Sequence, residues 1–260
     1  MCYDISFTKT LKELSDYFPD LVEEDQVKIN FDQSIHIVGH AYGLHPIIYR
    51  PKEAQQPHLK LMEWGCIPYY VKDPASFTRQ RATMLNARSE RILDDNKSYW
   101  NKIRNRRCLI PVSAFYEHRK VDGLKKKVPY IISIKDQPVF FIPGLYSVVK
   151  FPDNQGEMQE QWTFTLITRN ANKLMAQIHN DGENTERMPL LLPLNLSKKW
   201  LSEELEESAY REILNYEMPS ANLNYHTVYT IRTTKPRPDG KAKNESFDWG
   251  NVPAIEEGDW

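Results

Sequence analysis

The sequence predicts an α+β fold: a single domain around a curved, mostly antiparallel sheet or partly open β-barrel with flanking helices. Two observations lead to this prediction. Strand-like apolar runs crowd together in the middle of the chain, at residues 107–118, 128–134, 138–149 and 161–168. Helical patterns are interspersed among the strands without alternating strictly with them, which favours an antiparallel sheet or barrel.

The amino-terminal part of the chain contains one helix pattern and one strand pattern before the crowded strands begin. Residues 8–18 place Leu11, Leu14 and Phe18 on one helical face, with a threonine and a glutamate spaced as a capping box at the start. Residues 59–65 alternate apolar and polar side chains, as a half-buried strand does. We therefore expect a helix followed by a strand.

The rest of the chain adds helices and strands around the crowded runs. Ser98 is suited to cap a helix over residues 98–106. The lysine-rich segment 119–127 is typical of a loop that joins two strands of a hairpin. Beyond the crowded strands the patterns predict a short helix at 170–179, a buried strand at 188–193, a surface helix at 202–216 and a last strand at 225–231.

The composition is that of a globular protein. The chain has 260 residues, of which 40% are hydrophobic and 12% aromatic, enough to bury a core. We expect one domain over residues 1–234, followed by a loosely held polar and acidic tail over residues 235–260. No apolar run approaches the roughly 18 residues of a membrane helix, and no secretory signal pattern begins the chain. We therefore expect no membrane association.

Charge is distributed unevenly along the chain. The formal net charge is −1, but residues 245–260 hold five acidic residues and no lysine or arginine. Residues 79–127 hold 14 lysines and arginines against five acidic residues. This excess either lies on a solvated face or attracts an anionic partner. Proteins that coat duplex DNA are more basic throughout, so a short or single-stranded nucleic acid suits this chain better.

The three cysteines, Cys2, Cys66 and Cys108, are widely spaced and odd in number. Their spacing argues against a disulfide framework and against a zinc site. It fits a reducing cytosol, so we expect a cytoplasmic protein, acting as a monomer, with no metal and no cofactor.

Reactive side chains stand in four stretches where core-building does not require them. Cys2 opens the chain, Asn86 and Arg88 follow an apolar pair, Glu117 follows a long apolar run, and His179 ends a helix. Each has an ordinary explanation: a small apolar residue, a turn, an exposed cation, a strand-end charge, or a cation at a helix carboxyl end. Together they supply a nucleophile, a carboxamide, a carboxylate and an imidazole, the groups needed for covalent catalysis with proton transfer.

Several motifs, in order, give the chain a family resemblance. The motifs are "MC", "WGCIP", "NARSE", "RCLIPVSAFYEH", "PGLY", "TFTLITRNAN" and "IH…RMPLLLP", between residue 1 and about residue 193. This set resembles the SOS response-associated peptidase (SRAP) family, whose members crosslink to abasic sites in single-stranded DNA. The resemblance implies one domain on a curved, partly open β-barrel, and single-stranded DNA containing abasic sites as the partner.

The resemblance also implies site residues. Cys2, Asn86, Glu117 and His179 would form the catalytic site once Met1 has been removed, by ordinary processing or by the chain itself. An α-amine beside a thiol can trap the abasic aldehyde as a five-membered thiazolidine, which an internal cysteine cannot form. His179 could also assist β-elimination. The candidate DNA-binding residues are Arg88, Arg187, Thr168, Trp64, Tyr69, Tyr70 and His118.

The chain departs from the family pattern in places. The usual "MCGR" start is "MCYD", so Asp4 stands where a phosphate-binding arginine is expected, and phosphate contact is weakened or moves to another cation. The segment between His179 and Arg187 is longer than usual. Two other functions remain open from the residues: a cysteine-type peptidase or thiol hydrolase using Cys2, His179 and Asn86, and a module that binds single-stranded nucleic acid without a covalent bond.

Overall fold

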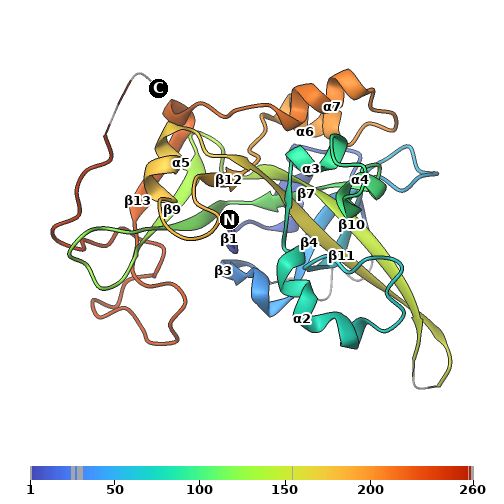
Figure 1. Cartoon of the computed structure of the whole chain (residues 1–260), viewed down its shortest axis with the longest axis horizontal. Helices are drawn as coiled ribbons and strands as arrows, with labels where there is room; N and C mark the ends of the chain where they lie inside the picture. Colours follow the sequence, from blue (N-terminus) through green and yellow to red (C-terminus); the bar gives the residue numbers. More distant parts are fainter. Residues whose placement is uncertain (1, 25–26, 28–31, 154, 257, 259–260) are drawn as a thin grey trace.

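The fold consists of two sheets with helices on their outer faces (Figure 1). A computed structural model of the protein describes residues 2–24, 27, 32–153, 155–256 and 258. The strands are β1 Asp4–Phe7, β2 Val22–Glu23, β3 Ser34–Val38, β4 Leu44–Tyr49, β5 His58–Trp64, β6 Asn86–Arg88, β7 Arg107–Val112, β8 Ala114–Arg119, β9 Val128–Ile134, β10 Phe140–Pro152, β11 Met158–Asn170, β12 Arg187–Pro189 and β13 Leu223–Thr227.

One sheet closes into a barrel. The strands follow one another in the order β5, β4, β7, β10 and β11, and β11 returns to pair in parallel with β5. Only two residue pairs make this closure, Thr163 with Glu63 and Phe164 with Trp64. The α+β prediction is thus confirmed, and the barrel is closed rather than partly open. β2, β6 and β12 extend the sheet beyond the ring.

Both faces of the barrel wall are buried. Along β7, Ile110 belongs to a core inside the barrel and its neighbour Leu109 to a second core outside it. Successive strand residues point to opposite faces, so a wall that is covered on both sides needs an unbroken apolar run. Trp200, in helix α6, packs in the outer core and donates its indole N–H to the Cys108 carbonyl at 3.0 Å.

The second sheet has the order β13, β9, β8, β1 and β3. The predicted run 107–118 is in fact divided at Ser113, where the chain leaves the barrel and enters this sheet. The Ser113 N–H donates to the Ser6 carbonyl at 2.7 Å, which ties the junction to β1. This division brings Glu117 opposite the start of the chain.

The helices are shorter than the sequence patterns predict. Residues 8–18 hold a 3₁₀-helix, Leu11–Asp16, whose first turn is held by the Glu13 carboxylate accepting from the Thr10 N–H at 2.7 Å. Ser98 caps its helix as predicted. Of the strand predicted over residues 188–193, only Met188 and Pro189 belong to a strand, which begins at Arg187. The α-helices are α2 Thr78–Arg81, α3 Glu90–Leu93, α4 Tyr99–Lys102, α5 Lys173–Ile178, α6 Leu194–Trp200 and α7 Glu207–Leu214.

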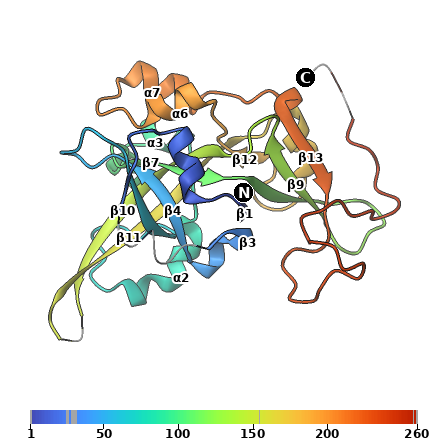
Figure 2. The same ribbon diagram turned by 180° about the vertical axis from the view of Figure 1, so that it is seen from behind.

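The carboxyl-terminal segment is not loosely held, in contrast to the prediction. It returns along the second sheet on the side of β13 (Figure 2). Arg237 is buried and donates to the carbonyls of Glu245 and Ser246. Trp249 donates its indole N–H to the Val228 carbonyl at 2.8 Å, and Ile255 is buried in the inner core. A few apolar side chains and one buried arginine therefore fix a segment whose composition is largely polar.

Among the described helices, none is both long and apolar enough to span a bilayer.

Candidate active site

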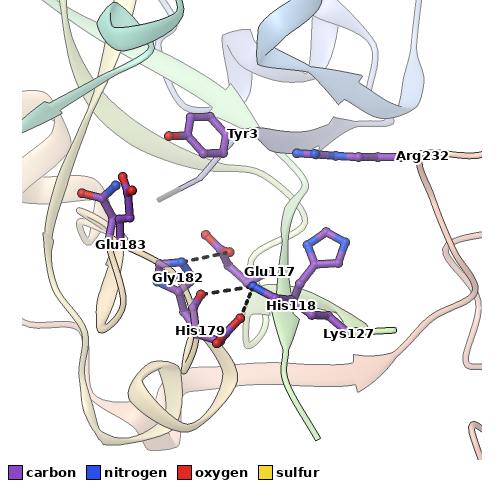
Figure 3. A pocket seen from close by; sticks show the side chains of 10 residues that line it. Tyr3, Glu117, His118, Lys127, His179, Gly182, Glu183 and Arg232 are labelled. Atoms are coloured by element: carbon purple, nitrogen blue, oxygen red, sulfur yellow. Dashed lines mark hydrogen bonds and ion pairs between the residues drawn. The ribbon is translucent and has the colours of Figure 1, made fainter. Parts of the chain in front are cut away.

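A cleft of about 380 Å³ opens beside the start of the chain (Figure 3). Its walls come from five parts of the sequence: the residue after Cys2, the end of β8, the residue before β9, the loop that follows α5, and the segment after β13. The lining includes Tyr3, Glu117, His118, His179, Lys127 and Arg232. Two of the four predicted catalytic residues, Glu117 and His179, thus line one cleft.

Strand pairing places Cys2 near this cleft. Asp4 pairs with Tyr116 and Ile5 with Phe115. When this pairing is continued toward the amino terminus, Tyr3 lies opposite Glu117. Cys2 is the next residue along the chain. Cys2 has no exposed surface, and its Sγ donates to the Asp4 carbonyl at 3.6 Å. Burial raises the pKa of the Cys2 thiol well above its ordinary value, and the Glu117 and Asp4 carboxylates raise it further.

Glu117 is a buried carboxyl at the end of an apolar strand. Its side chain follows the run Ala114–Tyr116, and the residue is 4% exposed. Burial raises the pKa of Glu117 to about 8, because a carboxylate is poorly solvated there. At neutral pH the group is therefore mostly protonated and can donate a proton.

His179 faces Glu117 from the end of α5. The backbone turns at His179, and its Nδ1 accepts from the Arg187 N–H at 3.3 Å. With Nδ1 an acceptor, the neutral ring carries its proton on Nε2, which lies 3.9 Å from the Glu117 carboxylate (Figure 3). Burial lowers the pKa of His179 to about 4, so the ring is neutral at pH 7. The two side chains form an uncharged pair, with Nε2 and the carboxyl oxygen 3.9 Å apart, further than a direct hydrogen bond.

Asn86 is a buried amide for which the described part of the chain supplies no hydrogen-bond partner. It is 7% exposed, and among the described residues neither its Nδ2 nor its Oδ1 has a hydrogen bond. Asn86 pairs with Leu166, a residue of the inner core to which Cys2 also belongs. A buried unpaired amide costs about 1–3 kcal/mol, so the position suits a residue that binds a group supplied later.

Comparisons with known proteins identify the family of the chain. A family model described as SOS response associated peptidase (SRAP) matches residues 1–234. The chain belongs to the SRAP family. The abasic site processing protein YoqW of Bacillus subtilis is 29% identical over 219 residues, covering 82% of this chain and 89% of that protein. The abasic site processing protein YMR114C of Saccharomyces cerevisiae is 30% identical over 174 residues, covering 65% of this chain and 42% of that protein.

Solved structures share the fold. A protein from Bacteroides thetaiotaomicron superposes with a TM-score of 0.74 at 27% identity, covering 94% of this chain and 97% of that one. A protein from Bordetella bronchiseptica superposes with a TM-score of 0.68 at 21% identity. The fold of this SRAP chain is therefore one that solved structures share.

Two of the predicted DNA-binding residues lie at the cleft of this SRAP chain. His118 lines it, half-buried. Arg88 is exposed, and its Nη2 donates at 2.7 Å to the amide oxygen of Asn184, which also lines the cleft. Tyr70 is exposed, but it packs edge-on against Tyr69 and Tyr99 and is not among the residues that line the cleft.

Three other predicted DNA-binding residues are buried in the SRAP domain, so they do not present a surface to DNA. Trp64 is 1% exposed, stacks on Phe164 and donates its indole N–H to the Leu85 carbonyl at 3.0 Å. Thr168 has no exposed surface, and its hydroxyl donates to the Ala87 carbonyl at 3.4 Å. These side chains belong to the barrel wall.

Arg187 is the third buried residue. Its guanidinium pairs with Glu90 and donates to the Asn170 side chain at 2.8 Å. The longer loop before it does not swing away, because the Glu186 N–H donates to the His179 carbonyl at 2.9 Å. Arg187 therefore orients His179 through its backbone N–H instead of reaching a phosphate.

The basic segment 79–127 is only partly a surface feature. Arg81 is buried against the Gly65 carbonyl, and Arg107 is buried under Trp200 and Tyr210. These cations hold loops together. Sequence reasoning also missed Arg232, which lines the cleft from the carboxyl-terminal side. The available signal was Asp4 in an apolar strand, which needs a cationic partner but does not say which one.

Proposed function

We propose that this chain senses abasic sites in single-stranded DNA and binds them covalently through Cys2 after Met1 has been removed. The observation that carries the proposal is the buried Glu117–His179 pair beside residue 2 of the chain, with the unpaired Asn86 amide on the same core. The family membership and the names of the relatives support abasic-site chemistry.

The covalent step follows from an amine and a thiol on adjacent carbons. The neutral α-amine of Cys2 attacks the aldehyde carbon of the open abasic sugar, and loss of water leaves an imine. The thiol then adds to the imine carbon, and its proton passes to the nitrogen, which closes a five-membered thiazolidine. The second attack is intramolecular, with effective molarities on the order of 10⁵ M or more for well-oriented groups.

The neighbouring side chains have the protonation states that this sequence of steps needs. Protonated Glu117 can give its proton to the departing hydroxyl of the first adduct and recover one from the amine. The neutral His179 ring can donate a hydrogen bond from Nε2–H to the sugar ring oxygen as the ring opens, and in its other neutral tautomer, with Nε2 free, it is the candidate base for β-elimination. The Asn86 amide can hold the new α-amine toward the aldehyde, and Arg88 can bind backbone phosphate.

The alternative of a thiol hydrolase has less support. That mechanism needs a thiolate paired with an imidazole. Burial and two carboxylates raise the pKa of the Cys2 thiol, and the His179 ring is directed to Glu117 and to the Arg187 N–H. An amine that attacks first, followed by a neutral thiol, fits these surroundings better.

The decisive experiment uses single-stranded DNA with one abasic site. Wild type is incubated with it and analysed by denaturing gel and intact mass, with Cys2→Ala and Cys2→Ser as variants and Cys66→Ala as the matched control. We expect a stable adduct from wild type and from Cys66→Ala, and none from Cys2→Ala. Cys2→Ser keeps the α-amine and loses the thiol, so its adduct should survive only after borohydride reduction.

Intact mass of the free protein provides the second part of the test, since the mature chain should begin at Cys2. An equal amount of stable adduct from wild type and Cys2→Ala would exclude the proposal. A stable adduct from Cys2→Ser without reduction would exclude the thiazolidine.

A further inference from the structure

We propose that Arg232 binds a DNA backbone phosphate at the mouth of the cleft, held in position by Asp4. The inference rests on the proposed function, because it names the cation that would hold the strand beside the same site. Arg232 follows the buried Ile231 and extends toward Tyr3 over the cleft (Figure 3). Its side chain is 46% exposed, whereas that of Asp4 is 3% exposed.

The contacts of the guanidinium leave one edge unoccupied. Nε of Arg232 donates to Oδ1 of Asp4 at 2.9 Å, and Nη2 donates to Oδ2 at 2.5 Å. This bidentate contact uses the edge formed by Nε and Nη2. Among the described residues, no partner is recorded for the edge formed by Nη1 and Nη2, and that edge has the fork geometry that matches two phosphate oxygens.

The surroundings of Asp4 keep its carboxylate charged and in a fixed position beside Arg232. It lies in β1, and besides Arg232 it accepts from Nε2 of His36 at 2.8 Å. Burial would raise the pKa of Asp4, but the hydrogen bonds from His36 and Arg232 outweigh it and hold the pKa below its usual value. The carboxylate is therefore charged and fixed under the surface, with the guanidinium pointing outward.

The other cations at the cleft are already engaged. Lys127 pairs with the Asp181 carboxylate at 2.8 Å and donates to the Asp181 carbonyl at 3.2 Å. Arg88 donates to Asn184. Asp181 and Asn184 belong to the loop after α5 and would have to be displaced, whereas the outer edge of Arg232 needs no rearrangement.

In this arrangement the cation is supplied from residue 232, and the acid at residue 4 orients it. The cation reaches the cleft from the carboxyl-terminal side instead of from β1.

The test measures binding of an undamaged, fluorescently labelled oligonucleotide by Arg232→Gln across a salt series. Each phosphate contact contributes about 0.7 to the slope of log K against log salt for a single strand. We expect Arg232→Gln to bind about tenfold more weakly at low salt and to lose about 0.7 from the slope. Arg232→Lys keeps the charge but loses the guanidinium edge formed by Nη1 and Nη2. Its slope should therefore stay at the wild-type value, while its affinity for the oligonucleotide falls.

The matched control is Lys150→Gln on the exposed β10–β11 hairpin, where the side chain pairs with Glu160 at 2.8 Å. Its affinity and slope should equal those of wild type. A wild-type slope for Arg232→Gln, with thermal unfolding unchanged, would overturn the inference, and so would an equal loss in the control. The undamaged oligonucleotide has no aldehyde, so this assay measures the phosphate contact alone. Absence of an adduct in the separate abasic-site experiment would count against the proposed function and would leave the result for Arg232 standing.

Discussion

Replacing Glu117 with glutamine should make the protein more stable, and by an amount that grows with pH. Burial sets the pKa of Glu117 at about 8 in the folded chain, against 4.5 as its ordinary value. Between these values the unfolded chain has released the proton and the folded chain has kept it. Because the unfolded state then binds fewer protons, the stability of wild type falls as pH rises through this window. Glutamine does not titrate, so the variant avoids the loss.

The size of the effect follows from the two pKa values, about 8 and 4.5. At about 1.36 kcal/mol per pKa unit the full difference has an upper limit of about 5 kcal/mol, reached above pH 8. The same values give about 1 kcal/mol at pH 5 and about 4 kcal/mol at pH 8. The stability gap between Glu117→Gln and wild type should therefore widen by roughly 3 kcal/mol from pH 5 to pH 8.

The assay is urea unfolding at pH 5, 6, 7 and 8, after intact mass has shown that both chains begin at the same residue. Glu90→Gln is the control, because burial would raise the pKa of Glu90 but hydrogen bonds from Arg187 outweigh it and lower it. The ionisation of Glu90 therefore affects stability only below about pH 5. The difference in free energy of unfolding between Glu90→Gln and wild type should stay constant across the series. A constant gap for Glu117→Gln as well would mean that Glu117 ionises as an ordinary carboxyl, and its role as a proton donor would fail.

Three further predictions test other parts of the site. Asn86→Leu removes an unpaired buried amide, so the variant should be as stable as wild type or more stable by about 1–2 kcal/mol in urea unfolding, while its rate of adduct formation falls at least tenfold. Arg187→Met removes the buried hydrogen bonds from the guanidinium to the Asn170 side chain and the Thr168 carbonyl, whereas its partner Glu90 is 49% exposed and stays solvated. The variant should lower stability by about 1–2 kcal/mol; a change below about 0.5 kcal/mol would place the arginine at the surface. Asp4 has a lowered pKa in the folded chain, so wild type should lose stability in urea as pH falls from about 4 to 2, whereas Asp4→Asn, less stable at pH 7, should show a smaller loss over the same range.

Much of the fold could be predicted because strands leave a local signal. The crowded runs became β7 to β11. Of these, β7 and β10 lie in the barrel wall, both faces of which are buried, so their apolar residues run on without alternating. The division at Ser113 and the closure of the barrel could not be predicted. A division within an apolar run depends on which partner strand each half finds, and two residue pairs between β11 and β5 leave no pattern in the sequence.

The burial of candidate site residues was predictable where a polar group breaks an apolar run. Asn86, Glu117 and His179 are all buried, as such positions suggest. Trp64 and Thr168 were predicted as candidate DNA contacts and both are buried, because a strand residue in a doubly covered wall has no exposed face and the sequence does not say that the wall is covered. Arg232 was missed for another reason: its partner Asp4 lies 228 residues away.

The surroundings of Cys2 also favour one order of steps in the proposed reaction. The thiol has no exposed surface and lies near the charged Asp4 carboxylate, so a thiolate is disfavoured there. An amine freed by loss of Met1 has the opposite preference, since carboxylates stabilise its charged form and a protonated Glu117 does not. Because Glu117 holds its proton to about pH 8, the amine meets a neutral carboxyl and keeps more of its reactive neutral form at pH 7. The amine should therefore attack first and the thiol second. Ionising Glu117 above pH 8 should slow the first step, even though a free amine in water reacts faster as pH rises.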